Sequence, residues 1–148
     1  PPDLVGHRVA LAGCGIYGSE AYLRRRSTRE LASLDWVDWE RGSERVFARW
    51  LRANVPDARI SLRVDTGWAF RDAIEAGAGV GLVPCALGEL ATGWQRLRRV
   101  ADLSSPLWVL THRDLRTTAR VRVVRDFVVE GLRRRRALLE GTKSRTKE

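Results

Sequence analysis

Apolar segments of strand length alternate with amphipathic segments of helix length along this chain, and that alternation restricts its fold more than any other feature. Residues 59–64 show the clearest strand pattern, because Ile60, Leu62 and Val64 fall on one side and polar residues on the other. The expected strands are 9–12, 36–39, 59–64, 80–83 and 107–111. This order of elements predicts an α/β fold with a mixed, mostly parallel sheet flanked by helices.

Helices are expected between these strands, and several carry capping signals at their ends. Gly42-Ser43 begins one helix, Asp65 or Thr66 caps a second that stops at Gly77, and Thr117 or Thr118 caps the last. Shorter helices are expected over 20–25, over 28–34 and over 85–90. The apolar positions of the three capped helices are 46, 47, 50 and 51, then 69, 70, 73 and 74, then 121, 124, 128 and 132.

The composition is that of a folded domain. The chain has 148 residues, of which 44% are hydrophobic, so it can bury a core without disulfides or a metal. Cys14 and Cys85 lie in small apolar surroundings, and we expect reduced thiols in a cytoplasmic protein. No apolar run approaches the roughly 20 residues of a membrane span, and no signal-peptide core is present. Because the chain opens on Pro1-Pro2 and contains no Met, we expect it to be part of a longer protein.

The positive charge is concentrated near the C-terminus. The chain carries a net charge of +9, and residues 132–148 contribute +5 of it from seven basic and two acidic side chains. Arg133 to Arg136 are expected to continue the final helix, which spreads their charge around it, and 141–148 to form a solvated basic tail. A nucleic-acid-binding module is one interpretation of this segment. It predicts salt-dependent binding that is lost when the residues after Gly131 are deleted.

A glycine motif follows the first expected strand. Gly13, Gly15 and Gly18 match the G-x-G-x-x-G pattern, and Asp38 ends the next strand twenty residues after the last glycine. In dinucleotide-binding units such glycines let the backbone approach a pyrophosphate, and the acid holds a ribose hydroxyl. The intervening segment divides into two short helices, whereas a dinucleotide unit has one long helix there. A glycine-rich turn without a nucleotide is the preferred interpretation, and an NAD or NADP site is the alternative.

Motifs of hydrolytic or metal chemistry are missing from the sequence. It has no G-x-S-x-G, no H-E-x-x-H and no C-x-x-C, and its two histidines, His7 and His112, stand in separate contexts. We therefore expect no catalytic residue, no metal ligand and no cofactor.

Two corners of the expected sheet have the composition of small-ligand sites. The first, 39–43, begins with Trp39 and ends with Ser43, and the second comprises Asp65, Thr66, Gly67 and Trp68. Both follow the carboxyl end of a strand and precede a helix, where α/β sheets bind ligands. Capping of the following helix is the alternative role for the polar residues, and the two roles are compatible.

Five segments, in this order, resemble the effector-binding domain of LysR-type transcriptional regulators. They are 17–23 (Tyr-Gly-Ser-Glu-Ala-Tyr-Leu), 30–32 (Glu-Leu-Ala), 35–37 (Asp-Trp-Val), 76–84 (Ala-Gly-Ala-Gly-Val-Gly-Leu-Val-Pro) and 107–122, which begins Leu-Trp-Val-Leu-Thr-His. The last two segments are specific in combination. The resemblance runs from about Gly6 to about Leu139.

The resemblance implies a fold like that of the type 2 periplasmic binding proteins, whose two lobes hold a small effector between them. By position, 1–15 is the crossover strand from the proximal lobe, 16–104 the distal lobe, and 105–140 the strand and helix that return to an incomplete proximal lobe. Residues 141–148 are the basic tail. The resemblance also implies that the segment from Gly13 to Gly18 is the crossover and binds no dinucleotide.

Carried over by position, the effector-binding residues are Tyr17, Trp39, Ser43, Asp65, Thr66, Gly67 and Trp68. The resemblance implies a cytoplasmic sensor of a small, anionic metabolite that is not an enzyme, contacts no membrane and reaches DNA only through an N-terminal domain missing from this chain. Because the final helix and strand 107–111 expose apolar surface, we expect a homodimer or tetramer.

Overall fold

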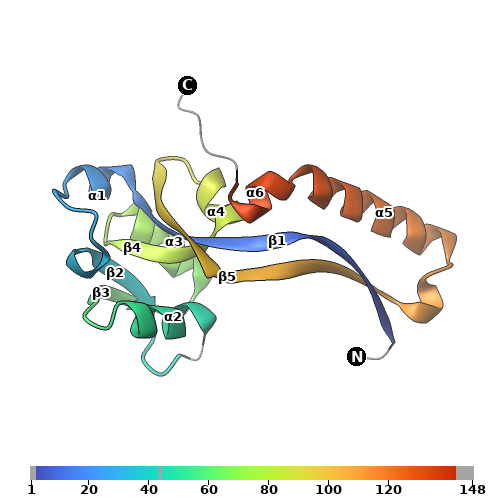
Figure 1. The fold of residues 1–148 in the computed structure, drawn as a ribbon, viewed down its shortest axis with the longest axis horizontal. Coiled ribbons are helices and arrows are strands. Elements are labelled where there is room, and N and C mark those ends of the chain that lie inside the picture. The colour runs from blue at the N-terminus through green and yellow to red at the C-terminus, as the bar shows by residue number, and fades with distance from the viewer. Residues whose placement is uncertain (1–2, 44, 143–148) are drawn as a thin grey trace.

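The chain folds around one mixed sheet of five strands, in the order β3-β2-β4-β1-β5. We describe a computed structural model, which places residues 3–43 and 45–142 (Figure 1). The strands are β1 (Leu4–Ser19), β2 (Asp35–Trp39), β3 (Arg59–Val64), β4 (Val80–Pro84) and β5 (Trp94–His112). Strand β2 is parallel to β3 and β4, whereas β1 is antiparallel to β4 and β5. The sheet is mixed as expected, with parallel and antiparallel pairings in equal number.

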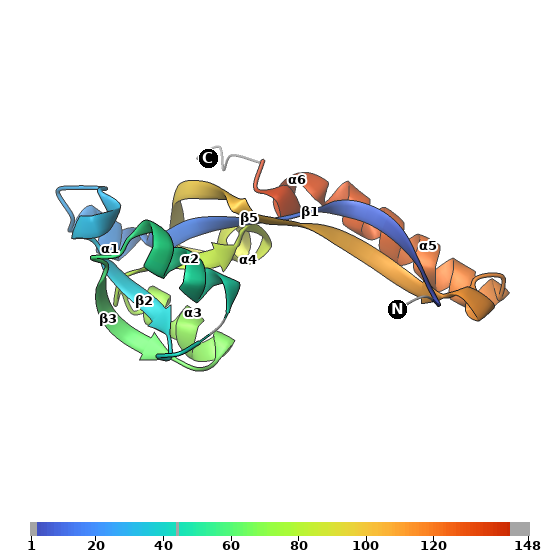
Figure 2. The same cartoon turned by 60° about the horizontal axis from the view of Figure 1, so that its bottom comes forward.

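Strands β1 and β5 are much longer than the sequence pattern predicts. Their paired halves leave the body of the sheet as a two-stranded ribbon, and helix α5 (Ala119–Arg134) runs beside it (Figures 1 and 2). The expected strand 9–12 continues through Gly13 to Ser19, and the expected strand 107–111 begins at Trp94. The added part of β1 is rich in glycine and the added part of β5 carries exposed polar residues, so neither shows apolar alternation. Backbone pairing between the two strands, rather than burial of one face, makes these segments strands.

The helices follow the expected order with altered bounds. The elements are α1 (Glu20–Arg24), η1 (Leu31–Ser33), α2 (Val46–Asn54), α3 (Gly67–Glu75), α4 (Cys85–Leu90), η2 (Arg113–Leu115), α5 and α6 (Arg136–Glu140). Two predictions for α3 are confirmed: the Thr66 hydroxyl accepts from the Ala69 N–H at 3.2 Å, and Gly77 ends the segment at a φ of +77°. The prediction that Ser43 begins α2 is wrong, because that helix starts at Val46 and the Ser43 hydroxyl accepts from the Arg45 N–H before it.

Each face of the sheet buries its own apolar cluster. Successive residues of β2 point to opposite faces, so Trp36 packs with α1 and α2 while Val37 packs with α3. On the second face Tyr17, Phe70 and Trp94 bring β1, α3 and β5 together. That face also borders a cavity, described below.

The final helical segment bends at Arg135. The expectation that Arg133 to Arg136 continue one helix is wrong, since α5 ends at Arg134 and α6 starts at Arg136. The bend turns α6 onto β1, where the Glu140 carboxylate accepts from the Leu11 N–H at 3.2 Å. The basic tail after position 142 lies outside the described residues.

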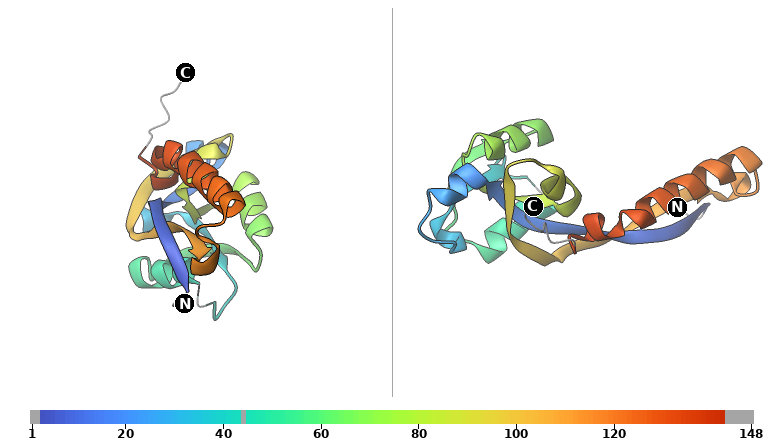
Figure 3. Two further views of the ribbon diagram at one scale, coloured as in Figure 1. Left: turned by 90° about the vertical axis from the view of Figure 1, so that its right-hand side faces the viewer. Right: turned by 90° about the horizontal axis from the view of Figure 1, so that it is seen from above.

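The expected apolar stripe of the final helix is largely uncovered. Val124 is 62% exposed and Val128 is 38% exposed, while Val129, one position further, is the buried residue of α5. The views in Figure 3 show α5 lying along the ribbon and apart from the body of the sheet. The helix therefore contacts the ribbon on a narrow strip and leaves much of its apolar surface exposed to solvent.

Candidate functional site

A cavity of about 730 Å³ opens at the carboxyl ends of β2 and β4. These strands are parallel, so their ends meet at one edge of the sheet, the edge at which α/β sheets bind ligands. The wall comes from the ends of β2 and β4, from helices α2, α3 and α4, and from the segment that leads from α4 into β5. Its residues are Trp39, Phe47, Gly67, Trp68, Phe70, Arg71, Glu75, Leu82, Val83, Pro84, Leu87, Leu90, Ala91, Thr92 and Trp94.

The structure brings three of the predicted effector-binding residues together in this cavity. Trp39 lines it from β2, and Gly67 and Trp68 line it from the first turn of α3. The side chain of Trp68 is accessible, since the residue is 75% exposed. A contact between these residues and an effector stays a prediction.

The other four predicted residues lie outside the cavity wall. Tyr17 is buried under α4 and donates its hydroxyl proton to the Glu89 carboxylate at 3.0 Å. Thr66 caps α3, while Asp65 is exposed beside it. Ser43 lies before α2 and makes the hydrogen bond to Arg45 described above. Thr66 therefore has the alternative role, capping of the helix that follows it.

Several residues of the cavity wall are not among those predicted from the sequence. Leu87 and Leu90 lie three apart on α4 and are 63% and 68% exposed, so they form an accessible apolar wall. Their spacing was a usable signal, because two leucines on a short helix with small neighbours predict one apolar face. Trp94 gave no signal, since it lies in the polar stretch that turned out to be β5.

The chemistry of the cavity is mainly aromatic and aliphatic. Trp39 stacks on Phe70 with ring centroids 5.1 Å apart, and the Arg45 guanidinium lies over the Trp39 ring, 4.2 Å from its centre. Charge at the rim is balanced, because Arg71 and Glu75 form an ion pair at 2.9 Å. The start of α3 adds the partial positive charge of a helix N-terminus. This lining suits a ligand with a large apolar part and a small polar or anionic group.

The glycine motif does not form a phosphate-binding loop. All three glycines lie inside β1 and no helix begins among them: Gly15 and Gly18 pair with β4 on one side and β5 on the other, and Gly13 lies at a register shift of the same strand. A Cβ at Gly13 would lie 2.6 Å from the Glu140 carbonyl oxygen, so this glycine permits α6 to pack on the strand. Asp38 lines a separate cavity of about 240 Å³ beside α2. The nucleotide-binding alternative is not supported.

The two cysteines are free and buried. Burial, together with the nearby Cys85, raises the pKa of the Cys14 thiol above its usual 9.0 to about 12. Among residues 3–43 and 45–142 no three His, Cys, Asp or Glu side chains gather where they would hold a metal ion. Within the same residues no helix is long and apolar enough to span a membrane.

Comparison with known families supplies the identification. The LysR substrate binding domain family matches residues 1–133 of this chain. The chain belongs to this family. It is the effector-binding portion of a LysR-type regulator, and its mixed α/β fold is the periplasmic-binding-protein-like fold that the resemblance implied. A search of curated proteins found no match.

Solved structures of LysR-type regulators share the fold at low sequence identity. The regulatory domain of CrgA from Neisseria meningitidis superposes with a TM-score of 0.62 at 22% identity, covering 88% of this chain and 69% of that domain. The effector binding domain of AmpR from Citrobacter freundii gives 0.58 at 18% identity, covering 89% and 69%. Full-length CbnR, complexed with its target DNA, gives 0.56 at 15% identity, and this chain spans 49% of its length.

Proposed function

We propose that this chain senses a small effector in the cavity between α3 and α4. The observation that carries the proposal is the position of an open, aromatic-lined cavity at the carboxyl ends of two parallel strands, in a member of the LysR substrate-binding family. The effector would be a largely apolar molecule with one anionic group, placed near the N-terminus of α3. Its role is binding, since domains of this family are typically not enzymes.

The organisation of the regulator is proposed from the family. Residues 16–104 would form the distal lobe, 1–15 the crossover strand, and 105–140 the strand and helix of the proximal lobe. A full-length relative binds DNA, so we propose that the sensor acts in the cytoplasm and controls a DNA-binding domain. Effector binding would shift the population of two arrangements of the assembly.

We further propose that the uncovered surface of the ribbon and α5 pairs with a second copy of the chain. Phe127 and Val123 on α5 are 79% and 67% exposed, and Leu110 and Trp108 on β5 are 55% and 49% exposed. So many large apolar side chains in one region exceed what a monomeric protein usually leaves in water. A symmetric pair would cover one such surface with another.

A binding measurement tests the sensing role. We expect 2-naphthoate, an apolar aromatic carboxylate that fits the cavity, to quench the tryptophan fluorescence of the wild-type chain in a saturable titration. Leu87→Glu places a second carboxylate in the wall at an exposed position, and we expect it to weaken binding at least about tenfold by charge repulsion and lost apolar contact.

The matched control is Leu115→Glu, which changes another exposed leucine, on η2 and outside the cavity wall. This variant should bind 2-naphthoate like the wild-type chain. Equal affinity of the Leu87 and Leu115 variants for 2-naphthoate would show that the ligand binds elsewhere and would contradict the proposed site. A chain that binds neither 2-naphthoate nor any member of a library of small organic acids would contradict the sensing role.

A further inference from the structure

Helix α4 has one face in the cavity and the other against the middle of β1. Leu87 and Leu90 belong to the cavity face. Gly88 and Glu89 belong to the inner face, where the absence of a side chain at Gly88 lets the helix rest directly on the Tyr17 ring. Any displacement of the cavity wall by a ligand therefore also moves the Glu89 carboxylate.

The Glu89 carboxylate is the centre of a buried polar chain. Its side chain is 8% exposed; its Oε1 accepts from the Tyr17 hydroxyl at 3.0 Å and forms an ion pair with Arg96 Nη1 at 2.8 Å. The same Arg96 nitrogen donates to the Gly141 carbonyl oxygen at 2.8 Å. Two side chains thus connect the wall of the cavity to the residue that ends α6.

The Gly141 end of this series of polar contacts is closely packed. Gly141 has a φ of +65°, and a Cβ there would lie 2.5 Å from the Cys85 sulfur and 2.8 Å from Arg96 Nη1. The α6 terminus is closed by hydrogen bonds from the Gly141 and Thr142 N–H groups to the Leu138 and Ala137 carbonyls. The end of α6 is packed tightly against Cys85, the first residue of α4, and against Arg96. A movement of α4 therefore displaces α6 as well.

We infer that Glu89 is a positioning residue that couples occupancy of the cavity to the seating of α6. An occupant that displaces Leu87 and Leu90 shifts the carboxylate, and a buried charge pair with hydrogen-bonded partners is costly to separate, so Arg96 and the Gly141 carbonyl follow. Since α6 joins α5 at Arg135, the movement reaches the helix that exposes Val123 and Phe127. This inference depends on the proposed function in one respect only, namely that the natural occupant of the cavity is a small effector.

A tethered occupant tests the coupling without knowledge of the natural effector. Leu87→Cys is labelled with monobromobimane, whose fluorescence is quenched by nearby tryptophans and so reports entry into the cavity; native Cys14 and Cys85 are buried. Amide hydrogen exchange of residues 136–141 is compared before and after labelling. We expect a change of at least about tenfold in the labelled protein, and no change when Glu89→Gln is combined with the label.

Two controls separate positioning from general loosening. Glu20→Gln removes an exposed carboxylate that pairs with Arg24 on α1, outside the cavity wall, and should leave the response to the label intact. Arg96→Lys retains a charge, but its side chain is one bond shorter and its ammonium does not reach Glu89 and the Gly141 carbonyl together, so it should abolish the response with the fold preserved. This second variant decides the matter if Glu89→Gln unfolds.

The outcomes for the coupling and for the sensing role are distinct. An unchanged exchange rate at 136–141 with the bimane quenched in the cavity overturns the coupling, whether or not 2-naphthoate binds. A response that persists in Arg96→Lys overturns the assignment to this polar chain. Failure of 2-naphthoate and of every member of the organic-acid library to bind, while the tethered label still alters α6, would contradict the sensing role and leave the coupling standing.

Discussion

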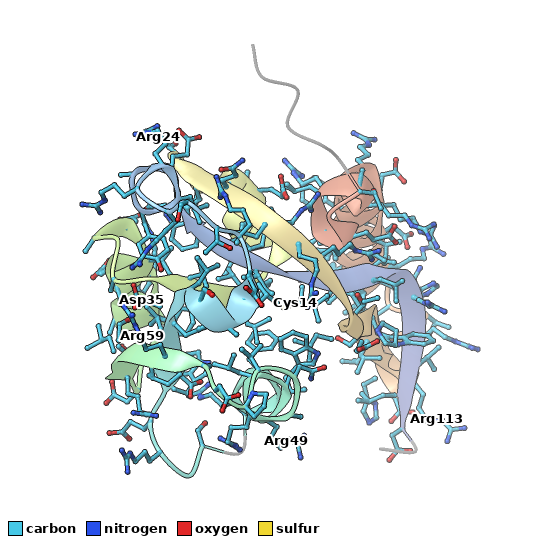
Figure 4. All side chains as sticks on the ribbon, turned by 60° about the vertical axis from the view of Figure 1, so that its left-hand side comes forward. Cys14, Arg24, Asp35, Arg49, Arg59 and Arg113 are labelled. Carbon is cyan, nitrogen blue, oxygen red and sulfur yellow. The ribbon has the colours of Figure 1, made fainter. Side chains whose placement is uncertain are left out.

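At the scale of single residues, Asp35 holds three elements together. It is 8% exposed and pairs with Arg59 on β3, both residues being labelled in Figure 4. It also pairs with Arg26 after α1 and accepts from the Tyr22 hydroxyl at 3.1 Å. Removal of this carboxylate leaves two guanidinium groups without their counter-charge. The residue therefore contributes more to stability than the exposed ion pairs on the surface of the helices.

Asp35→Asn should lower the free energy of unfolding by about 2 kcal/mol, a value below that of a fully buried pair because Arg59 is largely exposed. Urea denaturation measures the change. In Glu75→Gln, which breaks an exposed pair with Arg71, the loss should stay under about 0.5 kcal/mol. Equal losses in the two variants would show that Asp35 has no special structural role.

Cys14 supplies a second prediction at this scale. Because the folded chain keeps a thiol proton that the unfolded chain releases near pH 9, this group contributes stability below pH 9 that is lost as the pH rises toward 12. Cys14→Ala should therefore show a shallower fall in unfolding free energy above pH 9 than the wild-type chain. In native protein at pH 8, peptide mapping after iodoacetamide treatment should find Cys14 unmodified, whereas the unfolded chain reacts.

At the scale of elements, the docking of α6 on β1 depends on a glycine. Gly13→Ala places a methyl group 2.6 Å from the Glu140 carbonyl oxygen, so the helix must lift from the strand at a cost of roughly 1–3 kcal/mol. We expect limited trypsin digestion to cut this variant faster at Arg135 and Arg136 than the wild-type chain. Gly131→Ala, in open space on α5, should instead stabilise the helix by up to about 1 kcal/mol and leave the cleavage rate unchanged or lower.

At the scale of the whole molecule, the uncovered ribbon and α5 predict self-association. Light scattering coupled to size-exclusion chromatography should give the mass of a dimer or a larger assembly for the wild-type chain. Phe127→Glu should shift it to monomer, because a carboxylate would have to be buried in the paired surface. Val46→Glu, which changes an exposed apolar residue on α2, should leave the mass unchanged; a monomeric wild-type chain would contradict the proposal.

The short buried elements were predictable because each carries its own signal. Thr66 and Gly77 mark the ends of α3 through capping chemistry, and the alternation of 59–64 gives β3 without any tertiary information. The long strands were not predictable, since Gly13, Gly15 and Gly18 resemble a loop in the sequence, whereas the structure places all three in β1 and pairs Gly15 and Gly18 on both sides. Of the candidate site, Trp39, Gly67 and Trp68 followed from their places at strand ends.

The sequence by itself determined the family and the order of elements, because these depend on local periodicity and on motifs that keep their order along the chain. Only the tertiary structure decided where Leu87, Leu90 and Trp94 meet Trp39, and that Glu89 and Arg96 join α4 to Gly141. Such contacts link residues that lie on different elements far apart in sequence, and no periodic pattern of the sequence records them. The cavity and its connection to the C-terminal helices are therefore properties of the folded chain.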